Sequence, residues 1–390
     1  MTNSCPACQS ARTQPFFDLT DVPVSIGVQS LSAEEARSCR RGDLRLVFCR
    51  SCGFIWNRVF DPGRVEYSQR YDNSLDFSSV FQDYARRLVR RLIDTYNIRD
   101  KKVVEIGCGK GHFLTLLCEE GGNHGIGFDP SYEGEHTQSA ASARITYIRD
   151  FYGEKYTRHP GDLICCRHVF EHIPDPVGFL SMVRRAIGER APAIVYFEVP
   201  NVRFILEKLS VWDVIYEHCN YFSSESIAAL ARRCGFAVLR LEETYGTQFL
   251  SLEAKIADSA NGATPMIEDL SSLSAAVERF SEQVQNRRQS WELRIAQWQA
   301  EGRRAVIWGG GAKAVGFLNL LKVTDAIPYV VDVNPTKQGR YLPGTGQRIV
   351  PPDFLKEFQP QIVVLMNPIY RQEVEDQLGR LGVIAEVLAN

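Results

Sequence analysis

The chain begins with two Cys-x-x-Cys pairs, whose residue type and spacing are those of a metal site. The pairs are Cys5 with Cys8 and Cys49 with Cys52. Two intervening residues allow both sulfur atoms of a pair to face one ion, and four thiolates form the tetrahedral set that a structural Zn²⁺ ion prefers. We therefore expect a zinc ion that stabilises the fold, with four buried or redox-active thiols as the alternative.

A glycine-rich turn predicts a ligand site that is built partly from backbone atoms. Its residues read Glu105-Ile106-Gly107-Cys108-Gly109-Lys110-Gly111. Glycine lets a backbone approach a bulky ligand closely. The turn departs from the dinucleotide fingerprint G-x-G-x-x-G, because His112 stands at the third glycine position. A carboxylate at Glu105 would repel a pyrophosphate but would pair with a cationic amino group.

Acidic residues end the next two predicted strands. Asp129, which precedes Pro130, ends one of them, and its carboxylate suits the two hydroxyls of a ribose. Asp150 ends the other, where it can accept from an exocyclic amine while the neighbouring Phe151 stacks on a purine. With Glu105, these side chains match a ligand that carries an amine, a ribose and a purine.

The motif E-x-G-x-G-x-G, with an acidic residue after the second strand, resembles the class I S-adenosylmethionine-dependent methyltransferases. The resemblance implies S-adenosylmethionine as the cofactor. Residues 167–173 resemble that family's exit from the fourth strand, which flanks the methyl donor. The implied cofactor-binding residues are Glu105, Gly107, Gly109, Gly111, Asp129, Pro130, Asp150, Phe151 and His168.

Two longer strings extend the resemblance over nearly the whole chain. Residues 331–345 are close to V-D-x-x-P-x-K-Q-G-x-x-x-P-G, and residues 216–223 resemble Y-H-E-H-x-x-Y-F-S. These strings are similar to those of the zinc-containing sugar C-methyltransferases. That resemblance implies methylation of a carbon beside a keto group in a nucleotide-linked deoxysugar, as occurs in natural-product biosynthesis. Oxygen or nitrogen methylation of another small-molecule acceptor is the alternative.

The same resemblance implies catalytic residues around position 218. Methylation beside a ketone requires removal of a weakly acidic proton, and histidine titrates near neutral pH. His218 is therefore the candidate base, with Glu217 in support. Tyr216 or Tyr221 would donate to the enolate oxygen, and Tyr71 would reach the site from the segment after the zinc domain. A structural, hydrogen-bonded Glu-His pair is the alternative.

A second glycine-rich turn reads Gly309-Gly310-Gly311-Ala312-Lys313-Ala314 and satisfies G-x-G-x-x-A. Taken alone, it predicts a dinucleotide site and an NAD(P)-dependent reductase. In the resembling family this unit holds the nucleotide of the substrate, and an empty structural unit or a non-catalytic binding module are further alternatives. The implied substrate-binding residues are Lys313, Asp332, Lys337 and Arg340.

Strand and helix patterns alternate around both turns. They predict an α/β fold with two Rossmann-like doubly wound sheets and a small N-terminal four-cysteine zinc domain. The expected domains are residues 1–62, 63–258 and 259–390. Predicted strands are 103–106, 125–128, 145–147, 163–166, 193–197, 305–308, 328–331 and 362–366; predicted helices are 32–39, 80–96, 112–119, one from residue 312, and 265–304 with a break near Asn286.

Composition limits the class of protein. The 390 residues are 44% hydrophobic and 24% charged, which is typical of globular proteins and excludes disordered or low-complexity classes. A net charge of −2 offers little for binding a nucleic-acid backbone. No apolar stretch reaches the ~18 residues of a membrane span, and we recognise no signal peptide. We therefore expect a cytoplasmic protein that acts on a small molecule.

Overall fold

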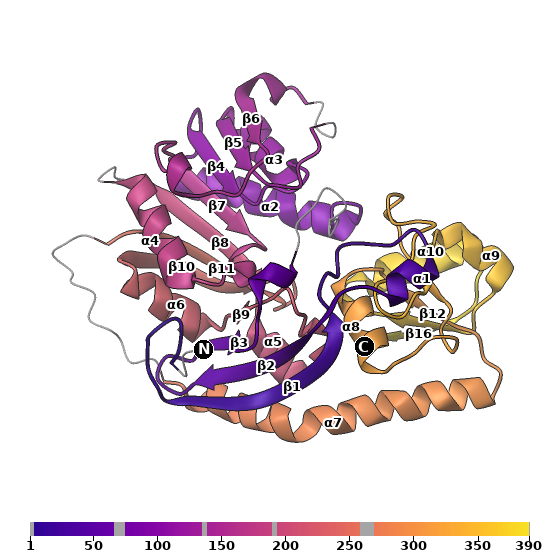
Figure 1. Ribbon diagram of the computed structural model, residues 1–390. Coiled ribbons are helices and arrows are strands. Elements are labelled where there is room, and N and C mark those ends of the chain that lie inside the picture. Colours follow the sequence, from indigo (N-terminus) through magenta and orange to yellow (C-terminus); the bar gives the residue numbers. More distant parts are fainter. Residues whose placement is uncertain (1–3, 66–74, 135–138, 189–192, 258–268, 390) are drawn as a thin grey trace.

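The computed structural model describes residues 4–65, 75–134, 139–188, 193–257 and 269–389. Within these residues the strands form three sheets, of four, seven and five strands, and Figure 1 shows how they are arranged. The two larger sheets contain the parallel strands of Rossmann-like units, and the four N-terminal cysteines cluster. The predicted fold class is therefore confirmed. No helix in these ranges is long and apolar enough to cross a membrane.

The N-terminal sheet includes one strand from the middle of the chain. Its order is β1-β2-β3-β9, with bounds β1 (Thr13–Pro23), β2 (Arg41–Cys49), β3 (Ile55–Asn57) and β9 (Asn220–Tyr221). In β9, Tyr221 pairs with Ile55. The segment that carries residues 216–223 is therefore attached to the cysteine-bearing sheet by its backbone. The predicted helix at 32–39 is α1 (Ala33–Arg37), and the side chain of Ser32 caps it.

The seven-stranded sheet lies at the centre of the chain. Its order is β10-β11-β8-β7-β4-β5-β6, in which β8 to β6 are parallel and the β10–β11 hairpin is antiparallel. The bounds are β4 (Lys102–Ile106), β5 (His124–Phe128), β6 (Ile145–Ile148), β7 (Leu163–Arg167), β8 (Ile194–Pro200), β10 (Phe236–Thr244) and β11 (Phe249–Ile256). The hairpin was not predicted from the sequence.

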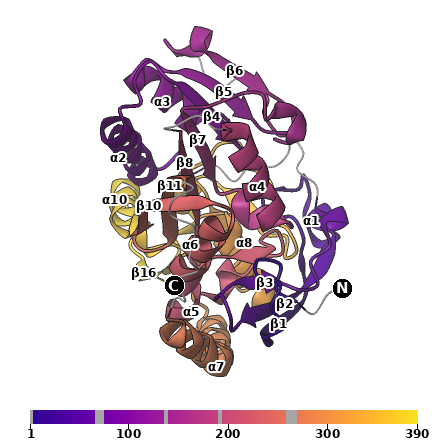
Figure 2. The same cartoon turned by 90° about the vertical axis from the view of Figure 1, so that its left-hand side faces the viewer.

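Helices cover both faces of this sheet (Figure 2). One face packs on α2 (Ser79–Tyr96) and α3 (His112–Gly121), and the other on α4 (Pro176–Ile187) and α6 (Ser224–Arg233). Successive residues of a strand point to opposite faces: Cys165 lies in the core below α2 and α3, whereas Cys166 lies in the core below α4 and α6. Both thiols are fully buried.

The C-terminal sheet is parallel throughout, in the order β14-β13-β12-β15-β16. Its strands are β12 (Ala305–Trp308), β13 (Tyr329–Val331), β14 (Arg348–Val350), β15 (Ile362–Leu365) and β16 (Glu386–Ala389). The associated helices are α8 (Ala312–Leu320), α9 (Leu355–Phe358) and α10 (Arg371–Leu381). The turn at Gly309 therefore follows the central strand of this sheet and precedes a helix.

A long helix, α7 (Ser271–Ala300), connects the N-terminal and C-terminal sheets along one side of the molecule (Figure 1). Phe280 packs edge-on against Phe17 of β1, with ring centroids 5.3 Å apart. Further along, Trp291 packs against Phe317 of α8 at 5.1 Å. The predicted break near Asn286 is wrong. Asn286 is exposed, and asparagine at such a position lowers helix stability by only ~0.7 kcal/mol.

The hydrophobic core does not follow the domain boundaries that the sequence suggested. One continuous cluster contains Leu44 of β2, Trp212 and Phe317 of α8. Another joins Cys5 and Cys49 to the central sheet. The boundaries at 62 and 258 stay a prediction, but cooperative unfolding of the whole chain is the expected consequence of shared cores.

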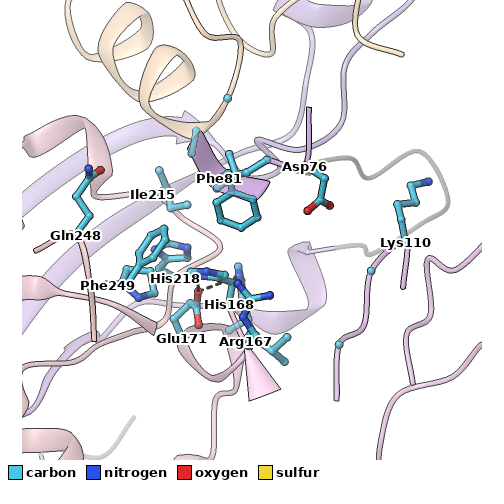
Figure 3. A pocket seen from close by; sticks show the side chains of 18 of the residues that line it. Asp76, Phe81, Lys110, Arg167, His168, Glu171, Ile215, His218, Gln248 and Phe249 are labelled. Atoms are coloured by element: carbon cyan, nitrogen blue, oxygen red, sulfur yellow. Dashed lines mark ion pairs between the residues drawn. The ribbon is translucent and has the colours of Figure 1, made fainter. Parts of the chain in front are cut away.

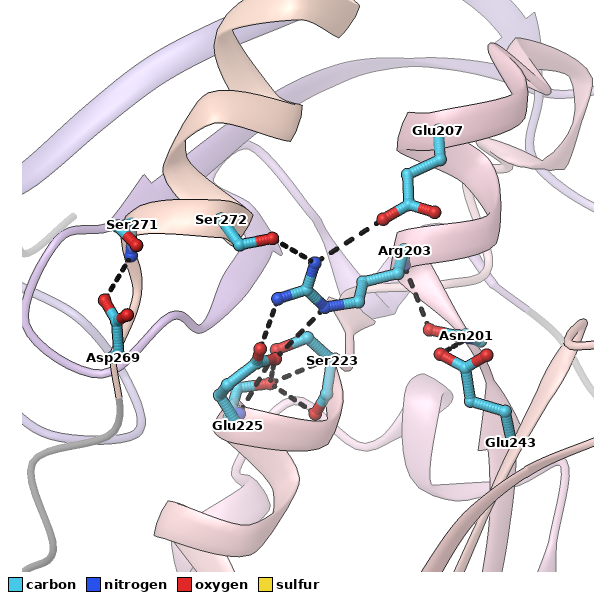
Figure 4. A network of polar contacts seen from close by, with 10 residues as sticks. Asn201, Arg203, Glu207, Ser223, Glu225, Glu243, Asp269, Ser271 and Ser272 are labelled. Atoms are coloured by element: carbon cyan, nitrogen blue, oxygen red, sulfur yellow. Dashed lines mark hydrogen bonds and ion pairs between the residues drawn. The ribbon is translucent and has the colours of Figure 1, made fainter.

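Arg203 joins three helices in a network of polar contacts (Figure 4). It belongs to α5 (Val202–Lys208), bonds to both carboxylate oxygens of Glu225 in α6, and lies 3.3 Å from Ser272 Oγ in α7. Burial by itself raises the pKa of Glu225. The hydrogen bonds from Arg203, Ser223 and the backbone and the positive charge of Arg203 together outweigh burial, so the pKa lies below its ordinary value.

Replacing Arg203 with methionine should destabilise the protein. Arg203→Met leaves Glu225 half-buried without its partner, which should lower the free energy of unfolding by ~1–3 kcal/mol at pH 7. Because the pair lowers the pKa of Glu225, its contribution is present above about pH 4.5 and is lost as the pH falls further. Urea unfolding at pH 7 and pH 4 measures both effects. Arg279→Met, at an exposed position of α7, is the control, and equal losses in the two variants would contradict the assignment.

Candidate functional site

A cavity of about 880 Å³ lies between the central and C-terminal sheets. Its walls come from the turns that follow the carboxyl ends of β4, β5 and β7 on one side and of β12 and β13 on the other. Ligands of open parallel sheets bind at this edge. Both glycine-rich turns line the cavity, through Gly107 and Gly109 on one side and Gly309 and Gly311 on the other. Figure 3 shows its central part.

Two glycines of the first turn, Gly109 and Gly111, have different surroundings. Gly109 has φ +54°, and a Cβ atom there would meet nothing within 4 Å, so its backbone faces open space. Gly111 has φ +84°, and a Cβ atom would lie 2.4 Å from the hydroxyl of Tyr147. Gly111 does not line the cavity. It permits close packing on Tyr147, so its predicted contact with a cofactor does not fit its placement.

Glu105 is a buried carboxylate at the wall of the cavity. The residue is 2% exposed, and no hydrogen-bond donor among the described residues reaches its Oε2 atom. Burial raises the pKa of Glu105 to about 8, and the positive charge of Arg167 offsets only part of this effect. Arg167 itself is held by Glu198, with Nη2 2.8 Å from Oε1. A buried, unpaired acid is costly unless a ligand supplies a cation or a donor.

The other residues predicted on this side also line the cavity. Asp129 accepts hydrogen bonds from the backbone N–H of Gly109 at 2.9 Å and from the hydroxyl of Ser131 at 2.6 Å. Asp150 accepts one from Tyr156 at 2.7 Å, and Phe151 is 62% exposed. His168 has φ +54°, and its Nε2 lies 3.0 Å from Glu198 Oε1. The predicted cofactor-binding residues that line the cavity are Glu105, Gly107, Gly109, Asp129, Pro130, Asp150, Phe151 and His168.

On the opposite wall, three of the four predicted substrate-binding residues line the cavity. Lys313 lies 2.6 Å from Asp213 Oδ1, so a phosphate there would compete with that carboxylate. Asp332 accepts from the backbone N–H of Gly310 at 2.8 Å, and Lys337 Nζ lies 4.0 Å from its carboxylate. Arg340 points elsewhere, and its Nε donates to the carbonyl of Thr336. Its predicted phosphate contact does not fit this position.

Of the predicted catalytic residues, His218 lines the cavity and three others do not. Glu217 is fully buried and accepts from the backbone N–H of Ile26 at 3.3 Å. The hydroxyl of Tyr216 accepts from the backbone N–H of Asp61, and that of Tyr221 donates to the carbonyl of Ile215. These three side chains do not line the cavity. The predicted hydrogen bond from Tyr216 or Tyr221 to an enolate oxygen therefore does not fit their placement, and the supporting role of Glu217 stays a prediction. Tyr71 lies outside the described residues.

Glu171 and His172 belong to the segment 167–173 that was predicted to flank the methyl donor, but neither was assigned a role. Both line the cavity. They form η4 (Phe170–His172), directly after β7. Burial raises the pKa of Glu171 to about 8 and lowers that of His172 to about 4. Burial also holds the pKa of His218 well below its ordinary value. The sequence signal was present as an acid and a histidine after a strand end, but such a pair is as common in structural roles.

The four N-terminal cysteines form a compact cluster. Their sulfur atoms lie within 4.8 Å of one another, with Cys5 and Cys52 at 3.7 Å and Cys8 and Cys49 at 3.6 Å. Four sulfurs at ~2.3 Å from one tetrahedral ion are separated by ~3.8 Å. The cluster therefore fits a structural Zn²⁺ ion.

Comparisons with known proteins agree with this architecture. Residues 78–241 match the family model of a methyltransferase domain, and residues 268–383 match that of a C-methyltransferase C-terminal domain. The C-methyltransferase NovU of Streptomyces niveus is 25% identical, with 85% of this chain and 82% of NovU covered. The chain belongs to the S-adenosylmethionine-dependent methyltransferases.

Other relatives match only part of this methyltransferase. A tRNA U34 carboxymethyltransferase of Aliarcobacter butzleri is 27% identical over 28% of this chain, which spans less than half (44%) of that relative. Among solved structures, the magnesium protoporphyrin IX methyltransferase ChlM of Synechocystis PCC 6803 with bound S-adenosylhomocysteine is 18% identical. Its TM-score is 0.37, with 47% of this chain and 86% of ChlM covered.

The cavity fits the donor of this methyltransferase. The unpaired carboxylate of Glu105 matches the ammonium group of S-adenosylmethionine, and the open backbone at Gly109 leaves room for the ligand. Asp129 and Asp150 lie on the same wall, as a ribose and an adenine require.

Replacing Glu105 with glutamine should weaken donor binding and remove its pH dependence. Because the pKa of Glu105 is about 8, the group holds a proton at neutral pH and must release it to pair with an ammonium ion. Wild-type affinity for S-adenosylhomocysteine should therefore rise from pH 6 to pH 8, and Glu105→Gln should bind tenfold or more weakly at pH 8 without that rise. Calorimetry in buffers of different ionisation enthalpy counts the proton. Glu120→Gln, near the C-terminal end of α3 and outside the cavity, is the control. Wild-type affinity and pH dependence in Glu105→Gln would refute the assignment.

Removing one thiolate should cost the protein its zinc and part of its stability. Cys49→Ser should reduce the zinc content by one ion per chain, because a tetrathiolate site depends on all four ligands. Cys49 is fully buried in the core shared with the central sheet, so the melting temperature should fall as well. Elemental analysis and calorimetry measure the two effects. Cys118→Ser, another buried thiol outside the cluster, controls for loss of packing; unchanged zinc in Cys49→Ser would exclude the site.

Proposed function

We propose that this methyltransferase methylates a carbon beside the keto group of a nucleotide-linked deoxysugar. The observation that carries the proposal is the shared cavity, which both glycine-rich turns line. A donor on the wall of the central sheet and a nucleotide on the wall of the C-terminal sheet would place the sugar between them. The similarity to the C-methyltransferase NovU, which covers 85% of this chain, supports carbon as the methylated atom.

His218 is the proposed base of this reaction. Its imidazole lines the cavity, and none of the hydrogen bonds observed among the described residues involves its ring nitrogens. A neutral imidazole takes the proton from the carbon beside the ketone, and the enolate carbon becomes the nucleophile. S-adenosylmethionine supplies the methyl group. The low pKa of His218 keeps the imidazole neutral at pH 7, although it also makes the imidazole a weak base.

The acceptor can be identified by the mass of the product. We expect a gain of one methyl group on a nucleotide-linked keto-deoxysugar when the protein is incubated with S-adenosylmethionine and a panel of such sugars. Exchange of the proton on the carbon beside the keto group for deuterium in D₂O would show that the protein removes that proton. A product methylated at oxygen or nitrogen would contradict the carbon assignment. Binding of NADH, with none of S-adenosylhomocysteine, would favour the reductase that the second turn alone predicted.

Replacing His218 with alanine should separate binding from turnover. His218→Ala should keep the affinity for S-adenosylhomocysteine within about twofold and lower kcat by ~10²–10⁴, the usual contribution of a general base. His124→Ala, at an exposed position of β5, is the control. Full activity of His218→Ala would remove this residue from the reaction.

A further inference from the structure

Glu171, His172 and His218 bring three potential metal ligands together at the wall of the cavity. One ligand atom of each lies within 4.8 Å of the others. Glu171 and His172 come from η4 after β7, whereas His218 comes from the segment that β9 attaches to the N-terminal sheet. The cluster is separate from the four cysteines, and its ligand set is two imidazole nitrogens and a carboxylate oxygen. Figure 3 shows Glu171 and His218 in the cavity.

Within the described part of the chain, the carboxylate of Glu171 has no lysine or arginine as a partner. The residue is 2% exposed, and no described hydrogen-bond donor reaches its Oε2 atom. No lysine or arginine among the described residues forms an ion pair with it. The nearest basic atoms are His172 Nε2 and His168 Nδ1, each 4.0 Å from Oε1. A buried carboxylate in this situation requires a cation or a proton from elsewhere.

His172 is oriented as a metal ligand requires. Its Nδ1 lies 3.0 Å from the backbone carbonyl of Glu217. A carbonyl oxygen only accepts, so Nδ1 carries the hydrogen and Nε2 keeps its lone pair. Nε2 is the atom nearest to Glu171. Metal-binding histidines commonly donate their far nitrogen to a carbonyl or a carboxylate in this way.

From this arrangement we propose that Glu171, His172 and His218 bind a divalent cation. The two nitrogens and one oxygen suit a first-row transition ion, whereas Mg²⁺ prefers oxygen ligands. Three protein ligands leave coordination positions open toward the cavity, where an oxygen atom of the acceptor can bind. This use of the ion rests on the proposed function, but binding of the ion does not. An ion on His218 would occupy the lone pair that takes the proton from the acceptor. The metal-loaded protein would therefore bind the acceptor without turnover, and the base role of His218 belongs to the metal-free protein.

Manganese is the probe that separates this site from the cysteine cluster, because Mn²⁺ prefers oxygen and nitrogen ligands over thiolates. Titration of the full-length protein, followed by the loss of the electron paramagnetic resonance signal of free Mn²⁺, should show one ion bound per chain. Glu171→Gln, which keeps the shape of the side chain, should bind Mn²⁺ tenfold or more weakly. His172→Gln should show the same loss. Glu373→Gln removes another carboxylate that lines the cavity and should leave Mn²⁺ binding unchanged.

Two results would overturn the proposal. One is wild-type protein that binds no Mn²⁺ up to about 1 mM, and the other is equal binding by wild type, Glu171→Gln and His172→Gln. Thermal melting shows that each variant is folded. Calorimetry with S-adenosylhomocysteine on the same preparations tests the donor site independently. Donor binding without Mn²⁺ binding would reject the cation site alone, whereas loss of donor binding in the wild type would reject the proposed function.

Discussion

The relative position of the two larger sheets depends on hydrophobic packing against the N-terminal sheet. One core joins that sheet to α7 and the C-terminal unit, and a second core joins it to the central sheet. Each glycine-rich turn needs only its own strand and helix to form. A cavity lined by both turns exists only if the carboxyl edges of the two sheets face each other. Phe280 on Phe17 and Trp291 on Phe317 are the contacts by which α7 maintains that arrangement. Burial of large aromatic side chains is well suited to this, because each removes a large apolar area from water.

Two buried carboxylates at the cavity wall differ in their ion-pair partners from two buried carboxylates elsewhere in the described residues. Glu198 is held by Arg167 and by the hydroxyls of Tyr84 and Tyr196, and Glu253 lies 2.5 Å from Arg91. At the cavity wall, Glu105 and Glu171 each have a buried oxygen without a hydrogen-bond partner, and neither forms an ion pair with a lysine or arginine among the described residues. A fold gains nothing from unpaired buried acids. In the proposed function and cation site, ligands complete their pairing: an amine pairs with Glu105 and a cation with Glu171.

The attachment of β9 to β3 gives the cysteine cluster a part in the site. The cluster closes the loop that leads into β3, and β3 pairs with residues 220 and 221, two positions after His218. Tyr216 and Glu217 contact Asp61 and Ile26, respectively. The cysteine-bearing sheet, whose four thiols do not line the cavity, therefore supports the segment that carries the imidazole. The same attachment explains why Tyr216 and Glu217, next to His218, form hydrogen bonds with the protein backbone and do not face the cavity.

Local sequence determined the elements, the two glycine-rich turns and the thiol cluster, because strand periodicity, glycine conformation and Cys-x-x-Cys spacing depend on near neighbours. The predicted strands and α1, α2 and α3 appear with small changes at their ends. The direction of each side chain around His218 was not predictable, since it depends on β9 pairing with a strand more than 150 residues away. The same holds for Glu171, which was assigned no role from the sequence, and for Arg340, whose predicted phosphate contact does not fit its position. Only the tertiary structure decides which polar groups face the cavity and which form hydrogen bonds within the protein, because two cores that share the N-terminal sheet set the positions of all three sheets.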